Sequence, residues 1–369
     1  MWLVVGTRPE AIKMAPVAHA LAARGLPPTV VFTGQHPGLS SNEFGLDGYA
    51  TVRLQCPGKQ DPHRHVRSVT AAILPLLRTP PRLLVVQGDT SSALGGALAG
   101  FTAGVPVAHV EAGLRTHDPL LPWPEEEYRT AIDAGAELLF APTATSAANL
   151  RAEQVSGEVH VTGNTAIDAL LAVQATLPPP AVRDGGAPRV LVTCHRRESW
   201  GEGLESIAAA LIQLASDGAA RIDFVLHPNP HIASQMRRSL EGHGGISLRP
   251  PSNHADLVCE IRDADLVLSD SGGIQEEAPA LGTPLLVLRD KTERPEAVHS
   301  GNALLVGTSA DAIVAQTRRL LGDPAARASM ARRAFPFGDG RAAPRIAAVI
   351  ESWLERRLKP EQRRRDGTG

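Results

Sequence analysis

Short hydrophobic segments alternate with longer amphipathic ones along almost the whole chain. In the first long segment, Met14, Val17, Ala18 and Leu21 have the i, i+3, i+4, i+7 spacing of a buried helical stripe. The short segments lack polar alternation, which is typical of parallel strands that helices cover on both faces. We therefore predict an α/β fold, with strands at Leu3–Val5, Val30–Phe32, Leu83–Val86, Val105–Val110, Leu138–Phe140, Val190–Val192, Phe224–Leu226, Leu266–Leu268, Leu285–Leu288 and Leu304–Val306.

This alternation pauses once, in a stretch rich in proline and glycine between Leu177 and Pro188. Such a composition is typical of a linker. We predict two similar Rossmann-like, doubly wound domains, residues 1–176 and 177–340, followed by a last helix that starts near Arg341. We interpret the arginines at positions 363–365 as part of a solvated tail rather than a binding patch.

Composition and charge narrow the class of protein. The chain has 369 residues, 43% of them hydrophobic and 21% charged, and a formal net charge of −2, which are ordinary values for a globular protein. The near-neutral balance argues against a nucleic-acid binder. The three cysteines are far apart, so neither a disulfide framework nor a zinc site is indicated. The apolar run at the N-terminus is too short for a signal peptide, and we expect a cytoplasmic protein.

Polar and charged residues follow nearly every predicted strand. Ligands of open parallel sheets bind beyond the carboxyl ends of the strands. One such segment is usually only a helix cap, but eight together indicate a cleft between two domains. The segments are Gly6–Glu10, Thr33–His36, Gly88–Thr90, His109–Thr116, His195–Glu198, His227–Pro230, Asp270–Gly273 and Arg289–Glu296.

Several of these segments suit an anionic ligand. Ser271, Gly272 and Gly273 precede a predicted helix, whose N-terminal N–H groups favour negative charge, although the same residues also form ordinary caps. Glu277 suits ribose hydroxyls or, alternatively, only the helix dipole. Arg8 suits either a phosphate or a surface ion pair. Without a dinucleotide or P-loop fingerprint, NAD and ATP chemistry are disfavoured.

Further titratable residues suit acid–base chemistry. His195 is followed by two arginines, whose mutual repulsion favours an anion nearby. The carboxylates Asp89, Glu111 and Glu125 suit general acid–base work, but a helix cap at Asp89 and an ion pair between Glu111 and Arg115 explain the same residues. Spacing alone does not decide between these interpretations.

A metal site is disfavoured by the pattern of histidines. The histidines that follow or flank the predicted strands lack the spacing of known zinc motifs, and we predict no metal; they are His36, His109, His227 and His299.

The motifs as a group resemble those of the non-hydrolysing UDP-N-acetylglucosamine 2-epimerases. The matching stretches occur in the family's order and cover almost the whole chain. They are Gly6–Pro16, Gly88–Thr90, His109–Thr116, Pro122–Glu126, Val161–Thr165, His195–Glu198, Asp270–Pro279, Thr292–Val298 and Gly338–Gly340.

The resemblance implies a glycosyltransferase-B fold with a cleft between its domains, the last helix (341–369) crossing back onto the first domain. It also implies interconversion of UDP-GlcNAc and UDP-ManNAc without a metal or other cofactor, by a cytoplasmic homodimer. In that chemistry C2 loses its proton as UDP departs, and UDP then re-adds to a bound 2-acetamidoglucal. Positioned acids, bases and cations suit these steps.

Residue roles follow from the resemblance by motif position. The catalytic positions are Asp89, Glu111, Glu125, His195 and Arg129, with the acid and the base left unassigned. The UDP-binding positions are Arg8, Ser271, Gly272, Gly273, Glu277 and Arg294. The segment Asn253–Leu257 lacks the aromatic residues common near the uracil, so base stacking is assigned to His254.

An activator site of the family is less well matched. Many bacterial members bind a second UDP-GlcNAc, and Gln35, Glu126, Arg196 and His227 match residues of that site. However, Pro37-Gly38-Leu39 replaces the usual arginine and acid or amide. We therefore expect weak or absent activation by substrate.

Four other functions remain open at this stage. A hydrolysing relative would release ManNAc and UDP with the same residues. An epimerase of another UDP-2-acetamido sugar, in antibiotic or polysaccharide synthesis, would also share them. A UDP-sugar glycosyltransferase would not need three carboxylates, and a non-catalytic sensor would not need His195.

Overall fold

The computed structural model describes residues 1–180, 186–194, 201–227 and 229–366. These residues form two compact units: Met1–Ala169 with Phe337–Gly369, and Leu170–Pro336. The division falls within helix α6 (Thr165–Gln174), upstream of the proline-rich stretch. The expected domain boundary at residues 176/177 stays a prediction.

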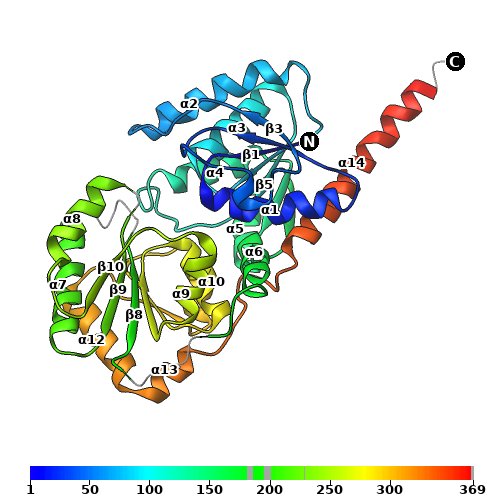
Figure 1. Cartoon of the computed structure of the whole chain (residues 1–369). Coiled ribbons are helices and arrows are strands. Elements are labelled where there is room, and N and C mark those ends of the chain that lie inside the picture. Colours follow the sequence, from blue (N-terminus) through cyan, green and yellow to red (C-terminus); the bar gives the residue numbers. More distant parts are fainter. Residues whose placement is uncertain (181–185, 195–200, 228, 367–369) are drawn as a thin grey trace. The chain divides into compact units, whose positions relative to one another are not determined.

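The first unit contains a seven-stranded sheet in which every strand pair is parallel (Figure 1). Its strands, in spatial order, are β3 (Ala50–Arg53), β2 (Thr29–Phe32), β1 (Trp2–Val5), β4 (Leu84–Gln87), β5 (Val107–Val110), β6 (Leu138–Ala141) and β7 (Glu158–Val161). The connecting helices are α1 (Arg8–Ala22), α2 (Pro62–Ile73), α3 (Ser91–Ala103), α4 (Glu125–Gly135) and α5 (Ala144–Ala152), with α6 after β7.

Both faces of this sheet are buried. Along β1, Leu3 and Val5 pack on one face with Met14 of α1, while Val4 packs on the other with Val69 of α2. The final helix, α14 (Ala342–Asp366), adds Ile346 to the cluster around α1. Consecutive hydrophobic residues on central strands such as β1 explain why the sequence shows unalternating runs.

The second unit has a six-stranded, all-parallel sheet. Its strands, in spatial order, are β10 (Ile246–Arg249), β9 (Arg221–Val225), β8 (Arg189–Thr193), β11 (Leu266–Ser269), β12 (Leu285–Val287) and β13 (Ala303–Leu305). Its helices are α7 (Glu202–Ser216), α8 (Pro230–Leu240), α9 (His254–Arg262), α10 (Gly272–Leu281), α11 (Pro295–His299), α12 (Ala310–Gly322) and α13 (Pro324–Met330).

The predicted α/β class with doubly wound parallel sheets is confirmed, and all ten predicted strands are present within a few residues of the expected bounds. Three strands were not predicted: β3, β7 and β10. Each lies at the outer edge of its sheet, and none has a buried residue.

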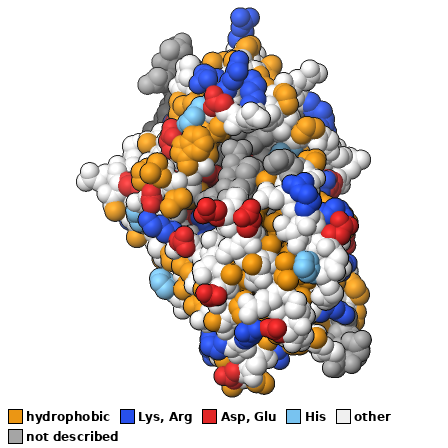
Figure 2. Space-filling model, turned by 90° about the vertical axis from the view of Figure 1, so that its left-hand side faces the viewer, with side chains coloured by type: hydrophobic (Ala, Val, Ile, Leu, Met, Phe, Trp, Pro, Cys, Tyr) orange, Lys and Arg blue, Asp and Glu red, His pale blue; other side chains and the backbone are white. Residues whose placement is uncertain are grey.

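The surface carries both signs of charge. Acidic and basic side chains are interspersed on the face shown in Figure 2. Within the described part of the chain, no helix combines the length and the apolar character needed to cross a membrane.

Candidate active site

The carboxyl edge of the first unit's sheet holds two of the predicted catalytic carboxylates. Asp89 follows β4 and Glu111 follows the neighbouring strand β5, with Gln87 and Val110 paired in register. The backbone of Glu111 is left-handed, with φ 70°, which non-glycine residues rarely adopt. Such an outlier is compatible with a functional constraint at this turn.

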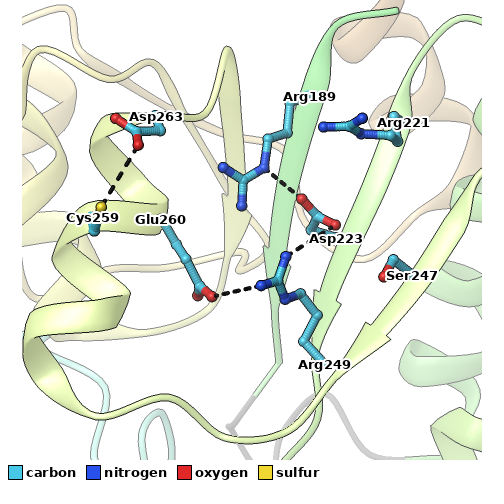
Figure 3. Close-up of a pocket in the computed structure, with 8 residues that line it drawn as sticks. All are labelled: Arg189, Arg221, Asp223, Ser247, Arg249, Cys259, Glu260 and Asp263. Atoms are coloured by element: carbon cyan, nitrogen blue, oxygen red, sulfur yellow. Dashed lines mark hydrogen bonds and ion pairs between the residues drawn. The ribbon is translucent and has the colours of Figure 1, made fainter. Parts of the chain in front are cut away.

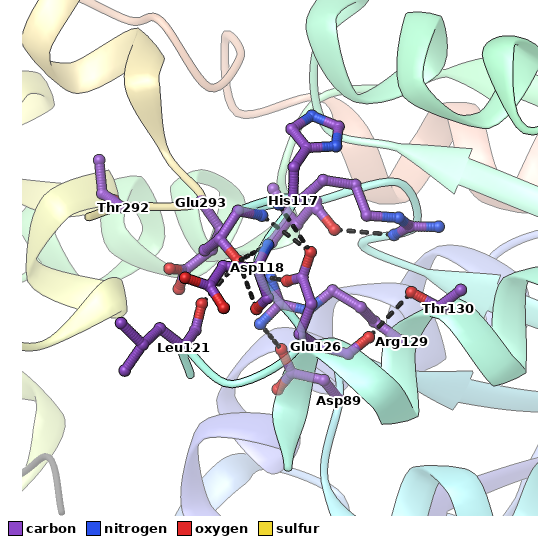
Figure 4. Close-up of polar contacts among 12 residues, drawn as sticks. Asp89, His117, Asp118, Leu121, Glu126, Arg129, Thr130, Thr292 and Glu293 are labelled. Atoms are coloured by element: carbon purple, nitrogen blue, oxygen red, sulfur yellow. Dashed lines mark hydrogen bonds and ion pairs between the residues drawn. The ribbon is translucent and has the colours of Figure 1, made fainter. Parts of the chain in front are cut away.

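Asp89 is bound by the predicted arginine. Arg129, on α4, donates from Nη2 to Asp89 Oδ2 at 2.6 Å, and its Nη1 lies 3.2 Å from Glu126 Oε2 (Figure 4). Arg129 is 1% exposed, whereas the Asp89 side chain is 26% exposed. A buried guanidinium therefore holds a carboxylate that solvent can still reach.

Glu111 is paired with a lysine that was not among the predicted site residues. Lys13 Nζ on α1 donates to Glu111 Oε2 at 2.7 Å, and Gln87 Nε2 donates to the same oxygen. Arg115, the partner considered from sequence spacing, pairs with Asp133 and Glu153. Lys13 lies within the matching stretch Gly6–Pro16, and this was the signal available for it.

The third carboxylate lies at a helix start. Glu125 is the first residue of α4 and is half-buried, and Glu126 and Glu127 complete an acidic first turn. Negative charge at this position is stabilised by the helix dipole. Arg129, one turn further along the same helix, joins α4 to Asp89.

A buried ionic network supports the turns that carry these carboxylates. His109 Nδ1 donates to Asp133 Oδ1 at 2.6 Å and Nε2 donates to the Gly88 carbonyl at 2.8 Å. Burial alone would raise the pKa of Asp133, but His109 and Arg115 lower it below its usual value. His109 thus holds Gly88, the residue before Asp89, in place. These two hydrogen bonds account for the buried position of the histidine.

A second buried carboxylate joins two loops at the same edge. Glu10 Oε2 accepts from the Gly6 and Thr7 N–H groups at 3.0 and 2.6 Å and from Thr7 Oγ1 at 2.7 Å, while Oε1 accepts from Thr90 Oγ1 at 2.7 Å. Burial raises the pKa of Glu10 to about 7. The sequence signal was the capping box Thr7-x-x-Glu10.

Arg8 is the first residue of α1. Its Nη1 is 2.9 Å from Glu43 Oε1, and its side chain is half exposed. An ion pair so exposed contributes little stability. Burial and the nearby charge of Arg8 lower the pKa of His36.

The two described candidates for the activator site in the first unit have internal partners. Gln35 Oε1 accepts from Ser92 Oγ at 2.7 Å. Glu126 is buried, and its Oε1 accepts from the backbone N–H groups of Thr116 and His117 at 2.9 and 3.1 Å. Both side chains thus stabilise loops of their own unit.

The second unit carries the predicted UDP-binding residues at the carboxyl edge of β11. Ser271 is the N-cap of α10, and its hydroxyl makes no capping bond. A Cβ at Gly272 would lie 2.7 Å from the Arg294 Cζ, so the close approach of that guanidinium requires glycine, whereas Gly273 is open. Arg294 Nε donates to Glu276 at 2.6 Å, and Nη1 bonds Glu293.

Glu277 and His254 are brought together from different helices. His254 Nε2 on α9 donates to Glu277 Oε1 on α10 at 2.8 Å. Burial lowers the pKa of His254, but the bond to Glu277 and its charge outweigh this and raise it above the usual value. His254 is therefore held in place by a carboxylate that was assigned to the same ligand.

Some of the remaining predicted site residues lie outside the part of the chain that the structure describes. His227 follows β9 and accepts from the Asn229 N–H at 2.9 Å. His299 is the last residue of α11. His195 and Arg196 lie outside the described residues.

Comparisons with known proteins agree with one another. The sequence model of a family described as UDP-N-acetylglucosamine 2-epimerase matches residues 19–351. The UDP-N-acetylglucosamine 2-epimerase of Yersinia pestis is 42% identical over 95% of this chain and 97% of that protein. The crystal structure of UDP-GlcNAc 2-epimerase from Neisseria meningitidis, bound to UDP-GlcNAc, has a TM-score of 0.89 at 34% identity and covers 96% of this chain and 99% of that one. The Methanocaldococcus jannaschii enzyme, in complex with UDP-GlcNAc and UDP, has a TM-score of 0.82 at 28% identity over 95% of this chain and 99% of that one.

Proposed function

The chain belongs to the UDP-N-acetylglucosamine 2-epimerase family, and from this membership we propose that it interconverts UDP-GlcNAc and UDP-ManNAc without net hydrolysis. The observation that carries the proposal is the match, over almost the whole chain, to proteins named UDP-N-acetylglucosamine 2-epimerase. The carboxylates at the edge of the first unit's sheet supply the groups that the chemistry requires.

The reaction removes a weakly acidic proton from C2 and returns one to the opposite face. Asp89, Glu111 and Glu125 are the proposed acid–base groups, and each is held by its fold: Asp89 by Arg129, Glu111 by Lys13, and Glu125 at the start of α4. Fixed orientation lowers the entropic cost of proton transfer.

Departure of UDP builds negative charge on the diphosphate, which cations and backbone N–H groups stabilise. The proposed diphosphate ligands are Arg8, at the start of α1, and the N-terminus of α10 at Ser271, Gly272 and Gly273, with Arg294 beside Gly272. Glu277, held by His254, is the proposed ribose ligand. His195 and Arg196 keep their proposed catalytic and activator-site roles, and His227 its activator-site role. We also propose that the enzyme is a homodimer.

Product analysis tests the activity. Purified protein with UDP-GlcNAc should give a mixture of UDP-GlcNAc and UDP-ManNAc whose composition becomes constant, as followed by proton NMR of the anomeric signals. Accumulation of ManNAc with free UDP would assign hydrolysis instead. If the spectrum stays unchanged, the substrate is another UDP-sugar or the reaction is glycosyl transfer.

A further inference from the structure

A polar hollow of about 500 Å³ lies on the second unit, between the β10–β9–β8 side of the sheet and α9 (Figure 3). Arg189 and Arg221 are the first residues of β8 and β9, and Ser247 and Arg249 come from β10. The proposed nucleotide ligand Ser271, in contrast, follows the carboxyl end of β11. Arg249 is the last residue of β10, so the hollow extends along the face of the sheet, and its lining shares no residue with the proposed nucleotide ligands.

The alternation of strand β9 places charge on this face. Ile222 and Phe224 are buried in the hydrophobic cluster on one side of the sheet. Arg221 and Asp223, the intervening residues, point to the other side, into the hollow. Asp223 is buried and lies opposite Ser247 in the strand register.

The three guanidinium groups in the hollow have far more donors than the protein satisfies. Arg189 Nε donates to Asp223 Oδ2 at 2.5 Å. Arg249 lies 3.7 Å from Asp223 and 3.8 Å from Glu260, too far for hydrogen bonds. Within the described part of the chain, the guanidinium of Arg221 makes neither a hydrogen bond nor an ion pair, and its backbone N–H donates to the Pro188 carbonyl. Each guanidinium carries five N–H donors, so most of them face the hollow or solvent.

The charges around the hollow also leave a positive excess. Three arginines face two carboxylates, those of Asp223 and Glu260. The third acidic residue of the lining, Asp263, is paired with Arg262 at 2.8 Å, and these two charges offset each other. Guanidinium groups match the oxygens of phosphate in geometry and charge.

We propose that this hollow binds a small phosphorylated anion, through Arg189, Arg221 and Arg249 with the Ser247 hydroxyl as an additional donor. Free phosphate and the phosphate group of a phosphomonoester share the chemistry that this site recognises. The proposal does not depend on the epimerase activity.

Isothermal titration of the full chain in a buffer free of phosphate and sulfate tests the proposal. Inorganic phosphate and glycerol 3-phosphate are the probes, with Arg221→Gln and Arg249→Gln as test variants. Arg238→Gln on α8, an exposed arginine outside the hollow, is the matched control. The substituted side chains are exposed or half-exposed, so folding should be retained, and thermal unfolding verifies it.

We expect wild type and Arg238→Gln to bind a probe with equal affinity, and both test variants to bind it at least about tenfold more weakly. If the probe bound at the nucleotide site instead of the hollow, wild type and all three variants would bind it with equal affinity. Tighter binding of glycerol 3-phosphate would assign a phosphomonoester, and equal binding of both probes would assign the phosphate group alone. Absence of binding to the wild type, or unchanged affinity in Arg221→Gln and Arg249→Gln, would overturn the proposal.

Discussion

At the residue scale, Asp89 combines a buried cationic partner with a side chain that solvent still reaches. We expect Asp89→Asn to reduce kcat by about 10²–10⁴-fold, the usual contribution of a general acid or base, and to leave the affinity for UDP close to normal. Asp311→Asn, an exposed substitution at the start of α12, is the control. Steady-state kinetics and UDP titration measure both quantities, and full turnover in Asp89→Asn would remove this residue from the mechanism.

Protonation of Glu10, at the carboxyl edge of the first unit's sheet, makes the stability of the folded state depend on pH. Its pKa is about 7 in the folded chain, above the ordinary value of 4.5, so the folded state binds the proton more tightly. The stability of the folded state therefore falls as pH rises from about 4.5 to 7, by about 3 kcal/mol for this group alone.

The Glu10→Gln variant tests the direction of this pH dependence, because the glutamine amide mimics the neutral acid. Its oxygen still accepts from the N–H groups of Gly6 and Thr7, and its NH₂ group faces Thr90. We expect the loss of stability between pH 5 and pH 7.5 in urea unfolding to be smaller in the variant than in wild type by about 2 kcal/mol. The same pH dependence in both proteins would contradict it.

The position of a site residue after its strand could be predicted from the sequence, but the side chains that it contacts on other elements could not. Asp89 and Glu111 follow hydrophobic runs, and this was enough to place them at a sheet edge. The contacts of Lys13 with Glu111 and of His254 with Glu277 join different elements and depend on how these pack. Periodicity carries no information on such contacts, and spacing alone suggested Arg115 for Glu111.

At the element scale, central strands were predictable and most edge strands were not. Strands β4 and β5 are buried at every position, so hydrophobicity alone reveals them. Strands β3, β7 and β10 have a single neighbour each and no buried residue, and polar side chains interrupt their hydrophobic runs. The edge strand β13 was found because Leu304–Val306 is an uninterrupted hydrophobic run.

The start of α14 depends on a carboxylate from α6. Asp168 accepts from the Ala342 and Ala343 N–H groups at 3.1 and 2.9 Å, and α14 contributes Ile346 and Trp353 to the core around α1. We expect Asp168→Ala to lower the free energy of unfolding by about 0.5–2 kcal/mol, the usual value of a lost helix cap. Asp47→Ala, on an exposed loop, should change it little. Urea unfolding measures both, and equal stability of the two variants would show that the cap contributes nothing.

At the scale of the whole molecule, the replacement of the activator motif by Pro37-Gly38-Leu39 has a kinetic consequence. Gln35 and Glu126 are also bound within their own unit. We expect hyperbolic kinetics in UDP-GlcNAc, with a Hill coefficient of about 1, and turnover of UDP-ManNAc alone. Sigmoidal kinetics, with UDP-ManNAc turned over only when traces of UDP-GlcNAc are added, would show that activation is retained.

The central claim is that the carboxylates of the first unit exchange the C2 proton of a UDP-2-acetamido sugar. Its most direct test is proton NMR of UDP-GlcNAc incubated with the enzyme in D₂O. We predict that deuterium replaces the C2 proton in both UDP-GlcNAc and UDP-ManNAc as they equilibrate. If the two UDP-sugars interconvert but both keep the original proton at C2, the claim is contradicted. In that case the proton is not passed to carboxylates that exchange with the solvent.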